Sequence, residues 1–469
     1  MKKTIIIFLV LAVFGLISCA EKEEESIYDK TDGDSEVTDD GEKQDYQVRP
    51  DGNGGTDDEK EDQNNNDDSD FVDSDTEENE DIDEDESIDD LSDESIDDDS
   101  DSDIDGTVIG NDDEPDPGTV CPASYAITKE SDIALIKDCN TIEGQLVIQN
   151  FPGIAITGLE NLRVIKGDFN ILTSTNLNSL EGFKNLESVG GGMYVFGNDS
   201  LVDLSDFEKL EKVEGWLHIK ENDGMEKISL PVLEYAGQFM VVDNNEMTEP
   251  DLPALAECGD FFQIITNDKL TSIASLKSLK KVGERLQISG NYLLTSLDGL
   301  DNLETVEGVL RLTTGKALTD LKKLSNLTAI GGLEISGNDL LTSLEGLENI
   351  TEIPGDVIVS GELLSSLKGL ENVTEIGGDL NINAVKEIIA FTDLSNLVNI
   401  GGDLKISYDL KLVSLQGLFN LLSLGGDLNI TSNALLPQCE ADNLKTYLET
   451  KSWDGTSTFS GNYGEGTCE

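Results

Sequence analysis

The sequence predicts a mainly β protein: a parallel solenoid of about thirteen turns with disulfide-stapled caps, preceded by a disordered acidic spacer. Three observations carry this prediction. A short apolar-x-apolar motif returns every 22 to 24 residues from Leu146 to Ile430, cysteines flank both ends of the repeats, and a long acidic tract precedes them. A unit this short cannot bury its own apolar face, so its neighbours in the chain must stack on it.

The first residues have the features of a targeting segment. Lys2 and Lys3 precede an apolar run over residues 4–17, which is too short to span a bilayer comfortably. The run ends Leu-Ile-Ser-Cys at Cys19, and this ending resembles the lipobox of bacterial lipoproteins. The resemblance implies a signal peptide over residues 1–18, a lipidated Cys19 and attachment to a membrane through that lipid alone. An ordinary signal peptide, cut near Ala20, is the alternative.

The residues after Cys19 bear on the location. By the same resemblance, Ala20 and Glu21 lack the Asp that retains some lipoproteins at the inner membrane. We therefore expect a lipid-anchored protein of the cell envelope, at the outer membrane or the cell surface.

Residues 19–118 form the predicted acidic linker. Between residues 21 and 118 there are 45 Asp and Glu against 5 Lys and Arg, and the apolar residues are sparse and show no period. Such a segment cannot bury enough surface to offset its ordering entropy, so we expect a disordered spacer. The whole chain has a formal net charge of −66, which argues against nucleic acid as a partner.

One part of this linker resembles a calcium-binding loop in its spacing. Asp101, Asp103 and Asp105 are followed by Gly106 and by Asp112, which is the spacing of oxygen ligands around Ca²⁺. The segment has Asp where a bidentate Glu is usual, and a tract this acidic produces the pattern easily by chance. We therefore treat these residues as a weak candidate and predict no dedicated metal site and no cofactor.

Cysteines bracket the repeats at both ends. We expect an N-terminal cap over residues 119–143, closed by a Cys121–Cys139 disulfide, and a C-terminal cap over residues 434–469, closed by Cys439–Cys468. Sequence alone leaves the other connectivities open. The remaining Cys258 is interpreted as a small buried apolar residue.

The repeats themselves occupy residues 144–433. Each contains a short strand whose alternate residues point inward. The inward pairs are Leu146/Ile148, Phe169/Ile171, Met193/Val195, Leu217/Ile219, Phe239/Val241, Phe262/Ile264, Leu286/Ile288, Leu310/Leu312, Leu333/Ile335, Val357/Val359, Leu380/Ile382, Leu404/Ile406 and Leu428/Ile430. An Asn follows at a fixed position in many units, which favours a stacked ladder that hydrogen-bonds backbone groups at a corner. Its members are Asn198, Asn222, Asn244, Asn267, Asn291, Asn338 and Asn433.

The segment SLEGLENITEIPGDVIVSG, with its relatives along residues 144–433, resembles the receptor L-domain family. The resemblance implies a right-handed parallel β-helix-like solenoid, akin to leucine-rich repeats, and a role in ligand binding. It does not carry over a ligand or growth-factor signalling, because the chain lacks the Cys-rich modules and the kinase segment of the receptors. Residues 223–262 depart from the pattern, so we expect a bulge or a junction between two lobes there.

The outward positions of the strands suggest where a ligand could bind. The middle residue of each inward pair and the residue after the pair point out, and in the N-terminal half many of these are apolar. The candidate binding face comprises Leu172, Tyr194, Phe196, His218, Lys220, Met240, Val242 and Ile265. Monomeric proteins seldom expose such a patch without a function. The alternative is that residues 223–262 or the first cap fold over it and make it core.

Catalysis has little support in the sequence. His218 is the single histidine, and no zinc-binding helix or phosphate-binding loop is present. We therefore expect a binding or adhesion protein for a protein or glycan ligand rather than an enzyme. A structural envelope component is the first alternative. A polysaccharide-acting β-helix enzyme is the second, but Arg311, Glu334 and Lys405 are too scattered across the turns for that chemistry to be assigned to them.

Overall fold

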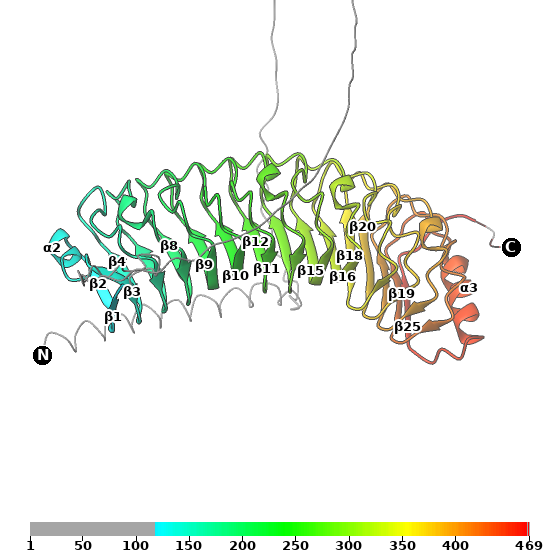
Figure 1. Ribbon diagram of the computed structural model, residues 1–469. Helices are drawn as coiled ribbons and strands as arrows, with labels where there is room; N and C mark the ends of the chain where they lie inside the picture. The colour runs from blue at the N-terminus through cyan, green and yellow to red at the C-terminus, as the bar shows by residue number, and fades with distance from the viewer. Residues whose placement is uncertain (1–117, 467, 469) are drawn as a thin grey trace, which may run out of the picture. The chain divides into compact units, whose positions relative to one another are not determined.

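The computed structural model describes residues 118–466 and 468. The predicted signal peptide, Cys19, the acidic linker and the Asp101 to Asp112 loop lie outside the described residues. The described residues form a solenoid of parallel strands that stack side by side along the chain (Figure 1). Every strand pairing between the described residues is parallel, as expected for a chain that returns once per turn.

The main ladder runs the whole length of the solenoid. Each strand in it pairs with the next in the following order: β2 (Tyr125–Ile127), β4 (Leu146–Gln149), β6 (Phe169–Leu172), β8 (Met193–Phe196), β9 (Lys212–Lys220), β10 (Tyr235–Val242), β12 (Phe262–Ile265), β14 (Leu286–Ser289), β15 (Thr305–Thr313), β16 (Ala329–Ser336), β18 (Val357–Gly361), β20 (Leu380–Val385), β22 (Leu404–Ser407), β24 (Leu428–Thr431) and β25 (Ser457–Ser460). The thirteen predicted turns correspond to β4 through β24, and the caps add β2 and β25 at the two ends.

A second ladder of short strands forms a neighbouring wall. It contains β1 (Thr119–Cys121), β3 (Cys139–Ile142), β5 (Val164–Ile165), β7 (Ser188–Val189), β11 (Glu257–Cys258) and β13 (Lys281–Val282), and it continues through the first residues of β9, β10, β15 and β16. Nearer the C-terminus, β17 (Glu352–Ile353), β19 (Glu375–Ile376), β21 (Asn399–Ile400) and β23 (Ser423–Leu424) form a separate sheet. The four long strands therefore join the two walls across a corner.

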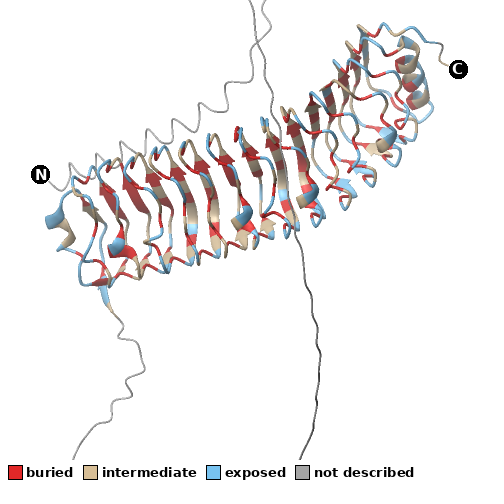
Figure 2. Ribbon diagram, turned by 90° about the horizontal axis from the view of Figure 1, so that it is seen from above, coloured by how far each residue is buried: buried red, intermediate tan, exposed pale blue. Residues whose placement is uncertain are grey.

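The register confirms the predicted inner column. Leu286 pairs with Leu310, which pairs with Leu333, and the same column continues to Leu380 and Leu404. These residues are fully or almost fully buried. Along most strands of the main ladder, buried residues alternate with partly exposed ones (Figure 2), whereas β4, β6 and β12 have buried residues at consecutive positions. The hydrophobic pattern thus fixes the register, because a slip by one residue would turn the whole inner column to solvent.

The Asn ladder is also confirmed. The side-chain Oδ1 of Asn198 accepts a hydrogen bond from the backbone N–H of Ser174 at 3.0 Å. Its Nδ2 donates to the carbonyl oxygens of Ile171, at 2.9 Å, and of Phe196, at 3.1 Å. All seven predicted Asn side chains are buried. Each amide therefore satisfies backbone groups at a buried corner that would otherwise lack partners.

The opposite wall is made of coil and short helical turns, as the three-residue apolar spacing predicts. Leu341, Leu344 and Leu347 from one unit are all buried. In four other units the wall contains a single 3₁₀ turn: η2 (Glu181–Phe183), η3 (Ala274–Leu276), η4 (Lys322–Leu324) and η5 (Thr392–Leu394).

Of the two expectations for residues 223–262, the bulge is present as a local register shift, and the junction between two lobes is not. This segment forms regular turns, and Phe239 stays in register with Leu217 and with Phe262. The one irregularity is a register shift between Ala236 and Gln238, and a similar shift lies between Val306 and Val309. The prolines of the segment occupy coil positions, where no strand hydrogen bond is needed.

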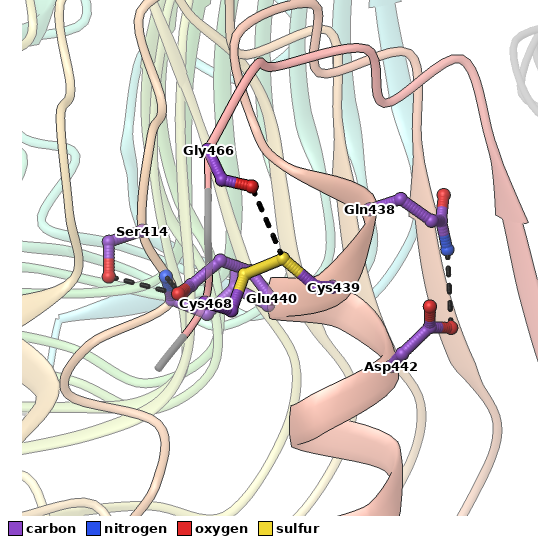
Figure 3. Close-up of a disulfide and its surroundings, with 8 residues drawn as sticks. Ser414, Gln438, Cys439, Glu440, Asp442, Gly466 and Cys468 are labelled. Carbon is purple, nitrogen blue, oxygen red and sulfur yellow. Dashed lines mark hydrogen bonds between the residues drawn. A yellow bond between two sulfur atoms is a disulfide. The ribbon is translucent and has the colours of Figure 1, made fainter.

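The two caps close the ends of the core as predicted. Disulfides join Cys121 to Cys139 and Cys439 to Cys468. The N-terminal cap holds β1, β2 and the short helix α2 (Glu130–Ile133), and the C-terminal cap holds the helix α3 (Gln438–Glu449) and β25. Cys439 lies at the start of α3, next to Glu440, which accepts hydrogen bonds from Ser414 Oγ and Leu415 N in the preceding turn (Figure 3).

Cys258 is free and buried, in agreement with its interpretation as a core residue. Burial raises the pKa of its thiol to about 12. Its Sγ contacts the carbonyl oxygen of Phe261 at 3.1 Å. Within the part of the chain that the structure describes, no helix is long and apolar enough to cross a bilayer.

Candidate ligand-binding face

The ladder brings the eight predicted face residues together. Tyr194 pairs with His218 and His218 with Met240 in one outward column. The adjacent outward column contains, in consecutive turns, Leu172, Phe196, Lys220, Val242 and Ile265. The eight side chains therefore occupy one outer face of the sheet, across β6, β8, β9, β10 and β12.

Packing on this face is closer than the sequence suggests. Leu172 is buried, with 7% of its surface exposed, and the other seven residues are half-buried. Neither predicted cover lies over them. Residues 223–262 are part of the sheet itself, and the first cap stacks on the end of the ladder through β2 and β4. The burial therefore comes from the face residues packing on one another.

A third outward column completes the face and was missed by the sequence analysis. Trp216 pairs with Gln238, and Phe261 occupies the equivalent position directly before β12. Each of these residues immediately precedes the first inward residue of its strand. The period of two that places His218 outward also places Trp216 outward, so the signal was present one step earlier in the strand.

The aromatic rings of the three columns form one cluster, which we call the aromatic platform. It consists of Tyr194, Phe196, Trp216, His218 and Phe261. The rings of Tyr194 and Phe196 are stacked, with centroids 5.5 Å apart and planes 24° apart. The Trp216 ring lies edge-on to Tyr194 at 6.2 Å and tilted against His218 at 5.4 Å. Phe261 stacks with His218 at 6.2 Å.

A glycine provides the space for the indole. A Cβ atom on Gly192 would come within 2.1 Å of the Trp216 ring, because the indole lies directly over this residue. Gly192 is the residue of the preceding turn that corresponds to Trp216 in the ladder. The Gly-Gly-Gly run before β8 thus allows Trp216 to lie against the sheet.

Two polar atoms on either side of Tyr194 lack partners. Asn170 and His218 are its neighbours in the ladder, on β6 and β9. Among the described residues, the buried Oδ1 of Asn170 and Nε2 of His218 have no hydrogen-bond partner. Burial lowers the pKa of His218 to about 4, and a side-chain hydrogen bond with Gln238 offsets part of this lowering. His218 is therefore neutral at physiological pH.

Amide side chains surround the platform. Gln263 Nε2 donates to Gln287 Oε1 at 3.1 Å, and Gln238 Nε2 donates to Asp260 Oδ2 at 2.6 Å. Two cationic side chains occupy outward positions beside the described rings: Lys220, which lies 3.7 Å from Glu221, and Arg285, which neighbours Phe261 in the third column. The platform is therefore apolar and uncharged at its centre and polar at its margin.

The C-terminal half has a different surface. Its sheet face is polar, but large apolar side chains protrude at the coil corner after the strands. They are at least two-fifths exposed and comprise Tyr292, Leu293, Leu340, Leu363, Ile389, Tyr408, Leu410 and Val413. This C-terminal ridge was not predicted from the sequence, because only the outward positions of the strands were considered as a surface.

The residues considered for catalysis are engaged in pairing between turns. Arg311 Nε donates to Glu334 Oε2 at 2.7 Å. Lys405 contacts Asp379 at 2.8 Å and Asp403 at 3.0 Å. Over residues 118–466 and 468, no group of three or more His, Cys, Asp or Glu is placed to hold a metal ion.

Comparison with known proteins adds one finding. No curated protein matches the sequence. A family model described as receptor L domain matches residues 138–247, a range that contains four of the five platform residues. The part of the solenoid around Tyr194, Phe196 and Trp216 is therefore similar to the receptor L domain, and this similarity indicates a ligand-binding, receptor-like role.

Proposed function

We propose that this chain is a lipid-anchored binding or adhesion protein of the cell envelope, in which the aromatic platform is the recognition face for a protein or glycan. The lipobox-like ending at Cys19 supports the anchor, and the acidic linker supports a spacer that holds the solenoid away from the membrane. The outer membrane or the cell surface is the proposed location.

The observation that carries the binding role is the platform itself. Five rings gather on the outer face of a sheet whose other side already supplies the core. Aromatic residues contribute a large part of the binding energy at protein interfaces, because their rings bury a large apolar surface. The match to a receptor domain over residues 138–247 points the same way and away from catalysis.

Binding to cell envelopes tests the proposal. We would add the full chain, solubilised in detergent, to envelopes from cells in which its own gene is deleted, and measure the protein that sediments with them. We expect saturable binding by the wild type. A Tyr194→Ser/Phe196→Ser variant should bind at least tenfold more weakly, because both rings of the stacked pair are removed.

A matched control separates binding from folding. Tyr292→Ser removes an aromatic ring from the C-terminal ridge, where 44% of Tyr292 is exposed, and should leave envelope binding unchanged. If the platform variant binds like the wild type and only its melting temperature falls, the platform is core and the proposal is wrong.

A further inference from the structure

We propose that the ligand of the aromatic platform is an uncharged glycan, whose sugar rings stack on Tyr194, Phe196 and Trp216. This inference rests on the proposed binding function and narrows it to one class of ligand. It follows from the shape, the charge and the unsatisfied polar atoms of the face.

The arrangement of the rings suits a sugar. Tyr194 and Phe196 are stacked on each other with 24° between their planes, and Trp216 lies over Gly192 beside them, so this half-buried cluster leaves apolar ring surface accessible to a ligand. The C–H face of a pyranose ring is apolar and of similar size to an aromatic ring. Stacking of the two removes apolar surface from water on both sides.

The polar groups at the margin suit hydroxyls. Asn170, Gln238 and Gln263 surround the rings with amides, which both donate and accept hydrogen bonds, as sugar hydroxyls do. The Asn170 Oδ1 and His218 Nε2 atoms beside Tyr194 are buried without a partner among the described residues. A hydroxyl at either side of the Tyr194 ring would satisfy them after a small rotation of the side chain.

Charge argues for a neutral glycan. Among the described residues, Lys220 beside the platform is close to Glu221, Arg285 is at the margin next to Phe261, and burial keeps His218 neutral. The chain as a whole carries a net charge of −66. An anionic polysaccharide would therefore meet repulsion from the protein as a whole.

The backbone argues against a peptide. Peptides often bind by adding a strand to an open sheet edge. Here β9 is hydrogen-bonded to β8 on one side and to β10 on the other, so the strands that carry the platform have no open edge. Recognition on this face must rely on side chains alone.

The envelope assay distinguishes the ligand classes. Mild periodate, which cleaves the vicinal diols of sugars, should abolish binding of the full chain to treated envelopes, and proteinase treatment of the envelopes should leave it intact. If proteinase abolishes binding and periodate does not, the ligand is a protein. The glycan proposal then fails while the binding function stands. If the platform variant binds untreated envelopes as well as the wild type does, both fail.

Purified polysaccharides test the class directly. In native gels containing dextran, a mannan, a β-glucan or a xylan, we expect at least one neutral polymer to retard the full chain, and polygalacturonate not to. Trp216→Ala should weaken the retardation roughly thirtyfold, as loss of a central aromatic contact does. Tyr292→Ser is the control and should be retarded like the wild type. Retardation by polygalacturonate alone, or equal retardation of Trp216→Ala and wild type, would overturn the proposal.

Tryptophan fluorescence gives a second readout that does not depend on affinity. The chain has two tryptophans, and Trp453 is buried in the C-terminal cap with 8% exposed. A Trp453→Phe chain therefore reports from Trp216 alone. Addition of the retarding polysaccharide should shift this emission, and binding without any change in it would place the sugar elsewhere.

Discussion

Asp409 occupies a ladder position that asparagine fills in the neighbouring turn, and this exchange predicts a pH-dependent stability. Its Oδ1 accepts a hydrogen bond from Val385 N at 2.7 Å, as the Asn side chains do in their turns. Its Oδ2 stands where an Asn would place a donating NH₂ group, and in the described residues this buried oxygen has no partner. Burial of the side chain raises the pKa of Asp409 to about 8.

The sign and size of the effect follow from linkage. The folded chain keeps the Asp409 proton up to about pH 8, whereas the unfolded chain releases it near pH 3.8, so the folded state binds more protons in this interval. Stability therefore falls as pH rises, by up to about 1.4 kcal/mol per pH unit, and levels off above about pH 8. The total penalty has an upper limit of roughly 6 kcal/mol.

Asp409→Asn should remove this penalty and restore the ladder. We expect the variant to be more stable than the wild type at pH 8, and the difference to shrink steadily towards pH 4.5. Melting temperatures from pH 4.5 to 9, with hydrogen exchange of peptides from residues 380–431 as a local probe, would measure it, since long repeat proteins can unfold in parts. Asn222→Asp is the converse control and should introduce the same pH dependence. A difference between wild type and Asp409→Asn that stays constant from pH 5 to 9 would refute the reasoning.

Three further predictions concern other parts of the chain. Cys19→Ser should move the protein from the membrane fraction to the soluble fraction after export, and unchanged fractionation would contradict the lipid anchor. Gly315 interrupts the Asn ladder beside a small cavity lined by Asn291, Leu294 and Asn338. After a small shift of Asn338, the side chain of Gly315→Asn should fill this cavity, accept a hydrogen bond from Asn291 N and raise the free energy of unfolding in urea by about 1 to 2 kcal/mol. A loss of stability would mean that Asn338 cannot move. In a Cys19→Ser chain, the buried Cys258 thiol, with its pKa raised to about 12, should resist Ellman's reagent at pH 8 until the protein is denatured, and rapid labelling of the native chain would contradict its burial.

The inner side of the fold could be predicted from the sequence because it is repeated in every turn. The pairs such as Leu286/Ile288 and the Asn positions recur at one spacing, and stacking converts that spacing into register. The two disulfides were predictable for a related reason, since four of the cysteines bracket the repeats. The inward pairs and the Asn ladder do not depend on contacts that occur only once.

The features that the sequence did not reveal depend on single contacts. The cap strand β25, Ser457–Ser460, contains no pair of aliphatic residues, and only its pairing with β24 makes it a strand. Asp409 was missed because the ladder was sought as asparagine. The burial that shifts its pKa also arises from tertiary packing, which local sequence does not show.

The candidate site was predicted in part. Alternation placed Tyr194, Phe196 and His218 on one face, and the ladder brings them together. Trp216 and Phe261 were missed because the outward positions were counted only from the first inward residue onward. The contacts that unite them with His218 span neighbouring turns, and the side-chain directions that create them follow from the packed structure.

The aromatic platform depends on one register that holds from turn to turn on the outer face. Gln263 and Gln287 are paired directly across β12 and β14, and their side chains touch at 3.1 Å. A Gln263→Cys/Gln287→Cys pair should therefore oxidise to a disulfide within one native chain, seen as a cross-linked peptide by mass spectrometry. A Gln263→Cys/Ser289→Cys pair, two residues out of register, should not. Cross-linking of the second pair in preference to the first would contradict the register, and the platform would lose its structural basis.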